Sequence, residues 1–558
     1  MHELLITNAQ IYDGLGNPAV SSDLAVKDGR IAAIGDNLGA ARETVDAQGL
    51  ALMPGIVDTH THYDAQITWD PMANPSPGLG VTTVVMGNCG FTIAPCRPAD
   101  RDLVMRNLTH VEGMSLAALR EGIRWEFQSF PEYLDYLERR GVGPNVACFV
   151  GHSSVRTFVL GEDAPKRPAT PAEIAAMQAI VVDAMKAGAC GFSTTTSFQH
   201  NGENGIPMPS RLADDAEMQA LCGSLRSVGR GVLMMTKAAT TPVPWIEDLA
   251  ACAGRPFVVA ALLHSNLTPE ASFEDLDHIR KACARGHRMY GAVACTPLKF
   301  EFTMHEPYVF EGLAAWQPAM AAHGDEAKRL YRDPAFRAAV KAELAKPARR
   351  LFTGEWEKIH VVQTARAENR RFEDKSLAEL SAQTDQHPID FLLDLSLGED
   401  LDTVFTAVLL NSDEEAVGRM IRDANSLLSL SDAGAHLTFL CDAGFGLHFL
   451  GHWVRNKQLM PFAEGVRRLT SHPAQVFGIR DRGRLALGAR ADLLLIDPAT
   501  VGRGPAKRVR DLPAGASRLD TPAVGLHGVW VNGQKIADVN GVLPDAQPAG
   551  TVVREFTA

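Results

Sequence analysis

Two histidines separated by one residue follow a short apolar run near the start of the chain. Residues 54–62 read PGIVDTHTH. Alternate side chains of a β-strand point to the same side, so His60 and His62 share one face while Thr61 points away. Imidazole nitrogens are ligands that zinc prefers, and this spacing lets both rings bind one ion. The pair therefore predicts part of a metal site, although an HxH pair alone is common and can be purely structural.

A cysteine follows the next apolar run, where residues 87–90 read GNCG. The flanking glycines allow the backbone to approach a neighbour closely, and a thiolate is a strong ligand for a soft divalent ion such as zinc. A cysteine is more often simply a small buried apolar side chain. Its place at the end of the second run, next to the histidine pair, favours Cys89 as a ligand.

Polar residues also follow two later apolar runs. His264 comes after the sixth run, in the sequence LLHSN, and Asp432 comes after the eighth, in LSDAGAH. Such residues can be ordinary solvated loop residues. At the same rim as the histidine pair, they would instead supply an imidazole ligand and a carboxylate that acts as ligand or general base. We therefore predict Asp432 as the group that takes a proton from metal-bound water and passes it to a leaving amine.

Eight short apolar runs alternate with segments of helical period, such as 171–187 and 215–228, over the middle of the chain. This βα alternation is typical of parallel strands, and eight units fit a closed (β/α)₈ TIM-like barrel with its active site at the carboxyl ends of the strands. The first fifty residues instead resemble a small antiparallel sheet, and the end of the chain has the same texture. We expect both termini to pair in one small discontinuous β-sandwich domain. The eight runs are 52–57, 80–86, 145–150, 189–193, 231–235, 257–263, 288–294 and 426–430.

The seventh connection interrupts this pattern for more than a hundred residues, from about 297 to 425. A bare loop of this length is uncommon in a compact domain. The charged helical segments within it predict a helical insertion over the mouth of the barrel, as a structural cap or as a lid that selects substrate. The predicted domain limits are 1–54 and 479–558 for the two parts of the sandwich, and 55–478 for the barrel that carries the predicted metal site.

Taken together, these motifs resemble a known superfamily. The chain resembles the amidohydrolase superfamily in four motifs. They are the histidine pair, GNCG at 87–90, SDAGAH at 431–436, and the segment 482–493, which begins with RGR and ends with ADL. Within this superfamily, the cysteine of GNCG resembles the N-acyl-D-amino-acid deacylases, or D-aminoacylases. The likeness runs from the first residues to about Pro498.

The resemblance implies a zinc-dependent amidohydrolase, with one or two divalent ions, that deacylates an N-acyl-D-amino acid by attack of metal-bound hydroxide. The implied site has His60 and His62 at one metal position, Cys89 and His264 at or near the other, and Asp432 as general acid and base.

The fifth run departs from the pattern of this family. The family has a histidine ligand at the end of the fifth strand, whereas residues 233–238 here read LMMTKA. Lys237 could be carbamylated and bridge two ions, as lysines do in other amidohydrolases. It could also remain a cation that binds a substrate carboxylate, or be a surface residue. The departure leaves the second ion and the usual substrate open.

Two further residues at the predicted rim are candidates for binding substrate. His152 follows the third run, and Ser193 begins a run of hydroxyl side chains after the fourth. Such side chains can hydrogen-bond a polar substrate, although serine and threonine are also normal where a strand becomes a loop.

The charge and the cysteine content indicate which kinds of partner and compartment to expect. Fifty-four Lys and Arg against 66 Asp and Glu give a net charge of −12, which argues against a nucleic-acid or anionic-membrane binder. Nine cysteines without a CxxC pair favour thiols in a reducing compartment, and the absence of a leader-like start or a long apolar window favours the cytoplasm. We expect a small-molecule amide substrate, no nucleic acid and no membrane, and homo-oligomer formation stays open.

Two other functions stay open at this point. The altered fifth run is compatible with a hydrolase of cyclic amides, of the hydantoinase or dihydropyrimidinase kind, or of another amide. A catalytically silent binding barrel belongs to a different class, and the matched set of predicted ligands argues against it. A phosphate loop GxxxxGK[ST] and a serine elbow GxSxG are both absent.

Overall fold

The computed structural model describes residues 1–202, 205–305, 307–310, 312–320, 322–346, 352–436 and 442–557. These residues form two compact units. The first contains Met1–Leu263, Ser272–Thr296 and Val417–Ala558, and the second contains His264–Ala271 and Pro297–Ala416.

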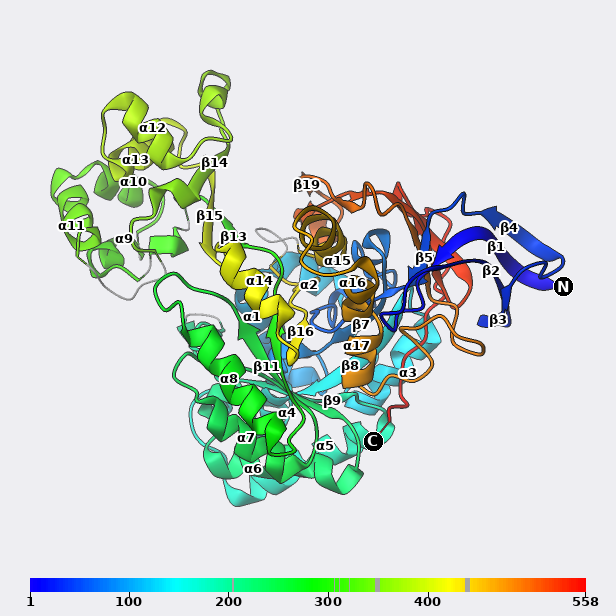
Figure 1. Cartoon of the computed structure of the whole chain (residues 1–558). Coiled ribbons are helices and arrows are strands. Elements are labelled where there is room, and N and C mark those ends of the chain that lie inside the picture. Colours follow the sequence, from blue (N-terminus) through cyan, green and yellow to red (C-terminus); the bar gives the residue numbers. More distant parts are fainter. Residues whose placement is uncertain are drawn as a thin grey trace. The chain divides into compact units, whose positions relative to one another are not determined.

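Eight parallel strands form one sheet in the first unit, in the order β16-β12-β11-β10-β9-β8-β7-β6. Strands β7, β8, β9, β11 and β16 of this sheet are labelled in Figure 1. A parallel bridge between Thr61 and Ala433, just beyond β6 and β16, joins the two edges of the sheet. The predicted fold class, a (β/α)₈ barrel, is confirmed. The strands are β6 (Ile56–Asp58), β7 (Val81–Met86), β8 (Asn145–Gly151), β9 (Gly191–Thr195), β10 (Val232–Thr236), β11 (Phe257–Leu262), β12 (Met289–Val293) and β16 (Ser426–Leu428).

Helices follow most of the barrel strands, and burial explains why the strands could be found from sequence. Every residue of β7, β8 and β9 is buried, so these strands are covered on both faces. β8 is a nearly continuous apolar run, whereas β7 includes two threonines and β9 ends in three hydroxyl residues. The main barrel helices are α3 (Phe130–Arg140), α4 (His152–Leu160), α5 (Pro171–Ala187), α6 (Asp215–Val228), α7 (Val243–Ala253) and α8 (Ala271–Ala284).

Shorter helices complete the first unit. The shorter helices are α1 (Arg101–Val111), α2 (Leu116–Gly122), α15 (Phe445–His448), α16 (Phe462–Leu469) and α17 (Ser471–Val476), while α14 (Glu414–Arg422) leads from the second unit back to β16.

Among all the described residues, no helix combines the length and apolar character needed to cross a membrane.

Both ends of the chain contribute to a nine-stranded sheet of the first unit. As expected, the termini pair, because β5 (Ala51–Pro54) lies antiparallel to β17 (Leu493–Ile496). The sheet is mixed rather than antiparallel, since β1 is parallel to β4 and β5 and antiparallel to β2. Its description as a sandwich remains a prediction. The other strands are β1 (His2–Ile11), β2 (Val20–Lys27), β3 (Arg30–Gly35), β4 (Ala41–Asp46), β22 (Leu526–Val531), β23 (Gln534–Asp538) and β24 (Gly541–Val542).

The first predicted apolar run, 52–57, is not one strand. Its beginning belongs to β5 and its end to β6, with Gly55 between the two sheets. A Cβ atom on Gly55 would lie 2.1 Å from Oγ1 of Thr82. The chain therefore passes from the terminal sheet to the barrel at a point where only glycine fits.

The second unit has its own apolar core, which includes Trp316, Phe352 and Phe405. The prediction of a purely helical insertion was incomplete, because this unit also contains an antiparallel sheet in the order β13-β15-β14. The strands are β13 (Leu298–Phe302), β14 (Ile359–Gln363) and β15 (Val404–Leu410), and the helices are α9 (Gln317–Met320), α10 (Asp325–Arg332), α11 (Pro334–Leu344), α12 (Leu377–Thr384) and α13 (Pro388–Gly398).

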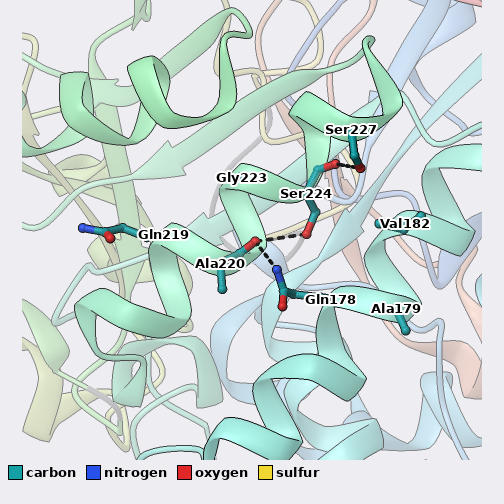
Figure 2. Close-up of a pocket in the computed structure, with 8 residues that line it drawn as sticks. All are labelled: Gln178, Ala179, Val182, Gln219, Ala220, Gly223, Ser224 and Ser227. Carbon is teal, nitrogen blue, oxygen red and sulfur yellow. Dashed lines mark hydrogen bonds between the residues drawn. The ribbon is translucent and has the colours of Figure 1, made fainter.

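An open groove lies between helices α5 and α6 of the first unit (Figure 2). Gln178 and Ser224 both donate hydrogen bonds of 3.0 Å to the carbonyl of Ala220. None of the lining side chains is charged, so the groove offers no acid, base or metal ligand. The lining residues are Gln178, Ala179, Val182, Gln219, Ala220, Gly223, Ser224 and Ser227.

Candidate metal centre

Side chains that follow the first two barrel strands meet at one point. The ligand atoms of His60, His62 and Cys89 all lie within 4.8 Å of one another, and all three side chains are buried. Sγ of Cys89 is 3.5 Å from Nε2 of His60 and 4.0 Å from Nε2 of His62. Two imidazoles and a thiol suit a borderline-soft divalent ion such as zinc. No second cluster of three such ligands occurs in the part of the chain that the structure describes.

Asp432, which follows the last barrel strand β16, also lies beside this cluster. Its Oδ1 atom lies 3.3 Å from Nε2 of His60 and 3.7 Å from Nε2 of His62. The same nitrogen of each ring therefore faces both the thiol and the carboxylate. The structure brings these four predicted residues together, and their roles as ligands or acid and base remain predictions.

Main-chain hydrogen bonds across the barrel closure place Asp432 beside the histidines. Its N–H donates to the carbonyl of His60 at 3.2 Å, and the N–H of His62 donates to the carbonyl of Ala433 at 2.7 Å. Asp432 has φ +47° and Gly434 has φ +92°, so this turn runs through the left-handed region. A Cβ atom on Gly434 would lie 2.7 Å from the carbonyl carbon of His62. The close approach explains a glycine here.

The loop that carries Cys89 is tied to the histidine strand. The side-chain amide of Asn88 donates to the carbonyls of Thr61 at 3.2 Å and Val85 at 2.9 Å. The N–H of Gly87 donates to Oδ2 of Asp64 at 2.9 Å. Cys89 itself has φ +56°, a backbone conformation that is uncommon for a non-glycine residue. These bonds hold the thiol toward the two imidazoles.

Two contacts of the cluster were not predicted from the sequence. Oε1 of Glu112 lies 3.0 Å from Nδ1 of His62, and Oγ1 of Thr236 lies 3.1 Å from Sγ of Cys89. Glu112 directly follows α1 and no motif distinguishes it from the other acidic residues. Thr236 ends the fifth barrel strand, directly before Lys237, so its position at the rim could have been predicted from the sequence.

Lys237 forms an ion pair instead of reaching the cluster through a described contact. Its Nζ atom lies 2.9 Å from Oδ2 of Asp275, and the Lys237 side chain is only 9% exposed. A carbamylated lysine would place a second negative charge beside the Asp275 carboxylate. The pairing therefore favours a simple ammonium group.

His264 belongs to the second compact unit and not to the cluster of three ligands. Its N–H donates to Oδ1 of Asn411 at 3.0 Å, and the N–H of Asn411 donates to the carbonyl of His264 at 2.8 Å. These bonds fix the backbone of His264 within its own unit. Its role as a ligand remains a prediction.

His152 and Ser193 are fully engaged inside the protein. The ring nitrogens of His152 lie 2.8 Å from Oγ1 of Thr194 and 2.8 Å from Oε1 of Glu217. Ser193 accepts from the N–H of Gly90 at 3.1 Å and donates to the carbonyl of Gly87. Ser193 thus supports the loop of Cys89, and contact of either residue with substrate remains a prediction.

The family follows from a comparison with known proteins. The model of the amidohydrolase family matches residues 43–537, which is most of the chain. This protein belongs to the amidohydrolase family.

Comparison with individual relatives indicates which members of the family this chain resembles. This amidohydrolase is 28% identical to the D-aminoacylase of Alcaligenes xylosoxydans xylosoxydans, over 96% of this chain and 94% of the relative. It is 29% identical to the N-acyl-D-aspartate deacylase of the same organism, over 96% and 92%. The solved structure of N-acyl-D-glutamate deacylase from Bordetella bronchiseptica, complexed with zinc and a phosphonate inhibitor, matches with a TM-score of 0.66 and 25% identity over 99% and 100%. The chain is therefore a metal-dependent amidohydrolase related to the D-aminoacylases, as the sequence motifs predicted.

Burial and charge set the ionisation of the site in this amidohydrolase. Burial alone would lower the pKa of His62, but the carboxylates of Glu112 and Asp432 outweigh it and raise this pKa well above its usual value. Burial would raise the pKa of Asp432, but the two histidines outweigh it and hold that pKa well below its usual range. The Asp432 carboxylate is therefore ionised at neutral pH.

The two remaining members of the cluster respond mainly to burial. Burial lowers the pKa of His60 to about 4, so its ring is neutral and can offer a lone pair at neutral pH. Burial raises the pKa of the Cys89 thiol, because a thiolate is poorly stabilised away from water. A bound divalent cation supplies the positive charge that a buried thiolate requires. The donor set and its surroundings therefore fit a metal ion.

Proposed function

We propose that this amidohydrolase removes the acyl group of N-acyl-D-amino acids by hydrolysing the amide bond. The observation that carries the proposal is the convergence of His60, His62, Cys89 and Asp432. The chain also matches two deacylases of N-acyl-D-amino acids over nine-tenths of its length. A second line of support is the likeness to a deacylase solved with zinc.

The proposed cofactor is zinc, bound by His60, His62 and Cys89 with Asp432 beside them. When bound, the ion supplies a Lewis acid that polarises the amide carbonyl and lowers the pKa of a water molecule. We also propose His264 as a metal ligand. The ion pair of Lys237 with Asp275 supports a cationic lysine that takes no part in metal binding.

Asp432 is the proposed general base and acid. Its carboxylate is ionised at neutral pH because the pKa is held low by the two imidazoles. It accepts a proton from the attacking water as the new C–O bond forms, and it donates that proton to the amide nitrogen as the C–N bond breaks. The products are a carboxylic acid and an amine.

The test of this function compares two classes of substrate on zinc-loaded enzyme. We expect hydrolysis of N-acetyl derivatives of D-amino acids, with the L enantiomers, hydantoins and dihydropyrimidines hydrolysed much more slowly. Hydrolysis of the cyclic amides in place of the N-acyl-D-amino acids would overturn the proposal.

The role of Asp432 has its own test. Asp432→Asn should lower kcat by about 100-fold or more, since general acid and base catalysis contributes effects of that size. Unfolding in urea and the zinc content of each preparation separate a loss of chemistry from a loss of fold or metal. An Asp432→Asn variant with wild-type turnover would show that another group moves the proton.

A further inference from the structure

His200 lies in the loop after β9, and hydrogen bonds hold both its ring and its backbone. Nδ1 of His200 is 2.8 Å from Oγ1 of Thr195. Its carbonyl accepts hydrogen bonds from the N–H of Met208 at 3.2 Å and from the side chain of Arg211 at 3.1 Å. The structure therefore defines one position for both the ring and the backbone of His200.

The contacts of His200 lead directly to the metal cluster. Its ring packs edge-on against Phe91, with centroids 4.9 Å apart, and Phe91 lies two residues after Cys89. Thr195, which holds the ring, also donates to the carbonyl of Thr236 at 3.0 Å, and the hydroxyl of Thr236 contacts Cys89. His200 therefore lies at the same rim of the barrel as the cluster.

The hydrogen bonds of Thr195 define which nitrogen of His200 carries the proton. The hydroxyl of Thr195 donates to the Thr236 carbonyl at 3.0 Å and accepts from the N–H of Ser197 at 3.0 Å. A hydroxyl has one proton, so its contact with Nδ1 is a hydrogen bond only if Nδ1 donates. Burial and the nearby imidazoles of His436 and His62 lower the pKa of His200 to about 3. The ring is therefore neutral, and Nε2 carries a lone pair.

We propose that Nε2 of His200 accepts a hydrogen bond from the N–H of the scissile amide, so that His200 positions the amide and selects amides over esters. Nε2 makes no hydrogen bond to a described residue, whereas the cluster of His60, His62, Cys89 and Asp432 is already mutually engaged. A secondary amide offers one N–H donor, and an ester offers none. This inference rests on the proposed deacylase function.

The test pairs a substitution with a change of substrate. His200→Phe keeps an aromatic ring against Phe91 and removes the lone pair. We expect kcat/KM for an N-acetyl-D-amino acid to fall about tenfold, the size of one hydrogen bond. For the matched O-acetyl ester of the D-2-hydroxy acid, which lacks the N–H, kcat/KM should change less than about twofold. If the ester binds without turnover, its inhibition constant replaces kcat/KM. Equal losses on the amide and the ester would overturn the proposal.

A matched control and two measurements without turnover complete the test. His287→Phe changes a partly exposed histidine that pairs with Glu247, and it should affect neither substrate. Zinc content should be equal in wild type and His200→Phe, because a loss would assign His200 to the metal instead.

Nitrogen NMR of ¹⁵N-histidine-labelled protein, with His200→Phe as the reference, should show a neutral ring with the proton on Nδ1 at pH 7. A proton on Nε2 would overturn the inference even if the wild-type enzyme failed to hydrolyse N-acyl-D-amino acids, an outcome that would separately refute the proposed function.

Discussion

Nδ1 of His62 lies 3.0 Å from Oε1 of Glu112, and both side chains are 4% exposed. The two atoms are at ion-pair distance without the geometry of a hydrogen bond. The other ring nitrogen, Nε2, faces Asp432. A carboxylate at the remote nitrogen of a ligating histidine fixes the ring orientation and makes the ligand more basic. Glu112 therefore acts on the cluster through His62.

The Glu112→Gln substitution tests this relationship. We expect zinc affinity to fall about 10-fold to 100-fold, the range found when such outer partners are removed. Competition with a chelator of known affinity measures the change. Glu121→Gln, at an exposed position on α2, is the matched control and should bind zinc as wild type does. Unchanged affinity in Glu112→Gln would mean that His62 is oriented without its carboxylate partner.

The hydroxyl of Thr236 lies 3.1 Å from Sγ of Cys89 and gives a second prediction. A hydrogen bond to a charged group stabilises it by about 1.5–3 kcal/mol, so removing the hydroxyl should weaken binding of a metal that needs the thiolate. We expect Thr236→Val to lower zinc affinity about tenfold or more, whereas Thr236→Ser keeps it. The thiolate-to-metal absorption band of the cobalt-substituted protein reports on the bond to Cys89. Identical bands and affinities in both variants would contradict the prediction.

Parts of the site could be predicted because they follow strands. The apolar runs before His60, Cys89 and Asp432 are buried barrel strands, and the carboxyl ends of such strands must meet at one rim. Glu112 and His200 lie in loops, where no periodicity fixes the direction of a side chain. Their approach to the cluster depends on individual side-chain contacts, such as the hydrogen bond between His200 and Thr195. No sequence motif or periodicity indicates that such a contact forms.

Secondary structure, too, could be predicted where the sequence carries local signals and not where it lacks them. Helices α5 and α6 begin and end at the predicted residues, because their ends carry strong local signals such as Thr170 with Glu173 and the terminal Gly188. Strand β15 was missed in a segment predicted to be helical. Its buried and half-buried residues alternate, but nearly all of them are apolar, so the composition does not reveal the alternation.

Two features favour glycine at position 434, its positive φ and its close approach to the backbone of His62, and their effects on stability can be measured separately. Gly434 and Gly488 both have positive φ, at +92° and +79°. A Cβ atom on Gly434 would lie 2.7 Å from the backbone of His62, whereas one on Gly488 would meet nothing within 4 Å. Gly488→Ala should therefore lower the free energy of unfolding by about 1 kcal/mol, and Gly434→Ala by about 2 kcal/mol more. Urea unfolding measures both changes, and equal losses would show that the backbone at His62 can move away.

The buried His472 of α17 predicts how stability depends on pH. This residue is 8% exposed, and burial with the charges of Arg468 and Arg467 lowers its pKa to about 3. The unfolded chain binds a proton on this ring below about pH 6.5, while the native protein does not bind it until about pH 3. The unfolded state therefore binds more protons in this window, and stability falls as the pH is lowered through it. Between pH 7 and pH 5 this residue should cost the wild type about 2 kcal/mol.

Two variants isolate that effect of His472. His472→Gln and His472→Phe differ in polarity and packing, so their free energies of unfolding at pH 7 should differ from each other. Both lack the titrating ring, so both should lose about 2 kcal/mol less than wild type between pH 7 and pH 5. Urea unfolding at each pH gives the slopes, and the metal ligands, which also titrate, are common to all three proteins. A wild-type slope in both variants would mean that the native protein already accommodates a charged ring at position 472.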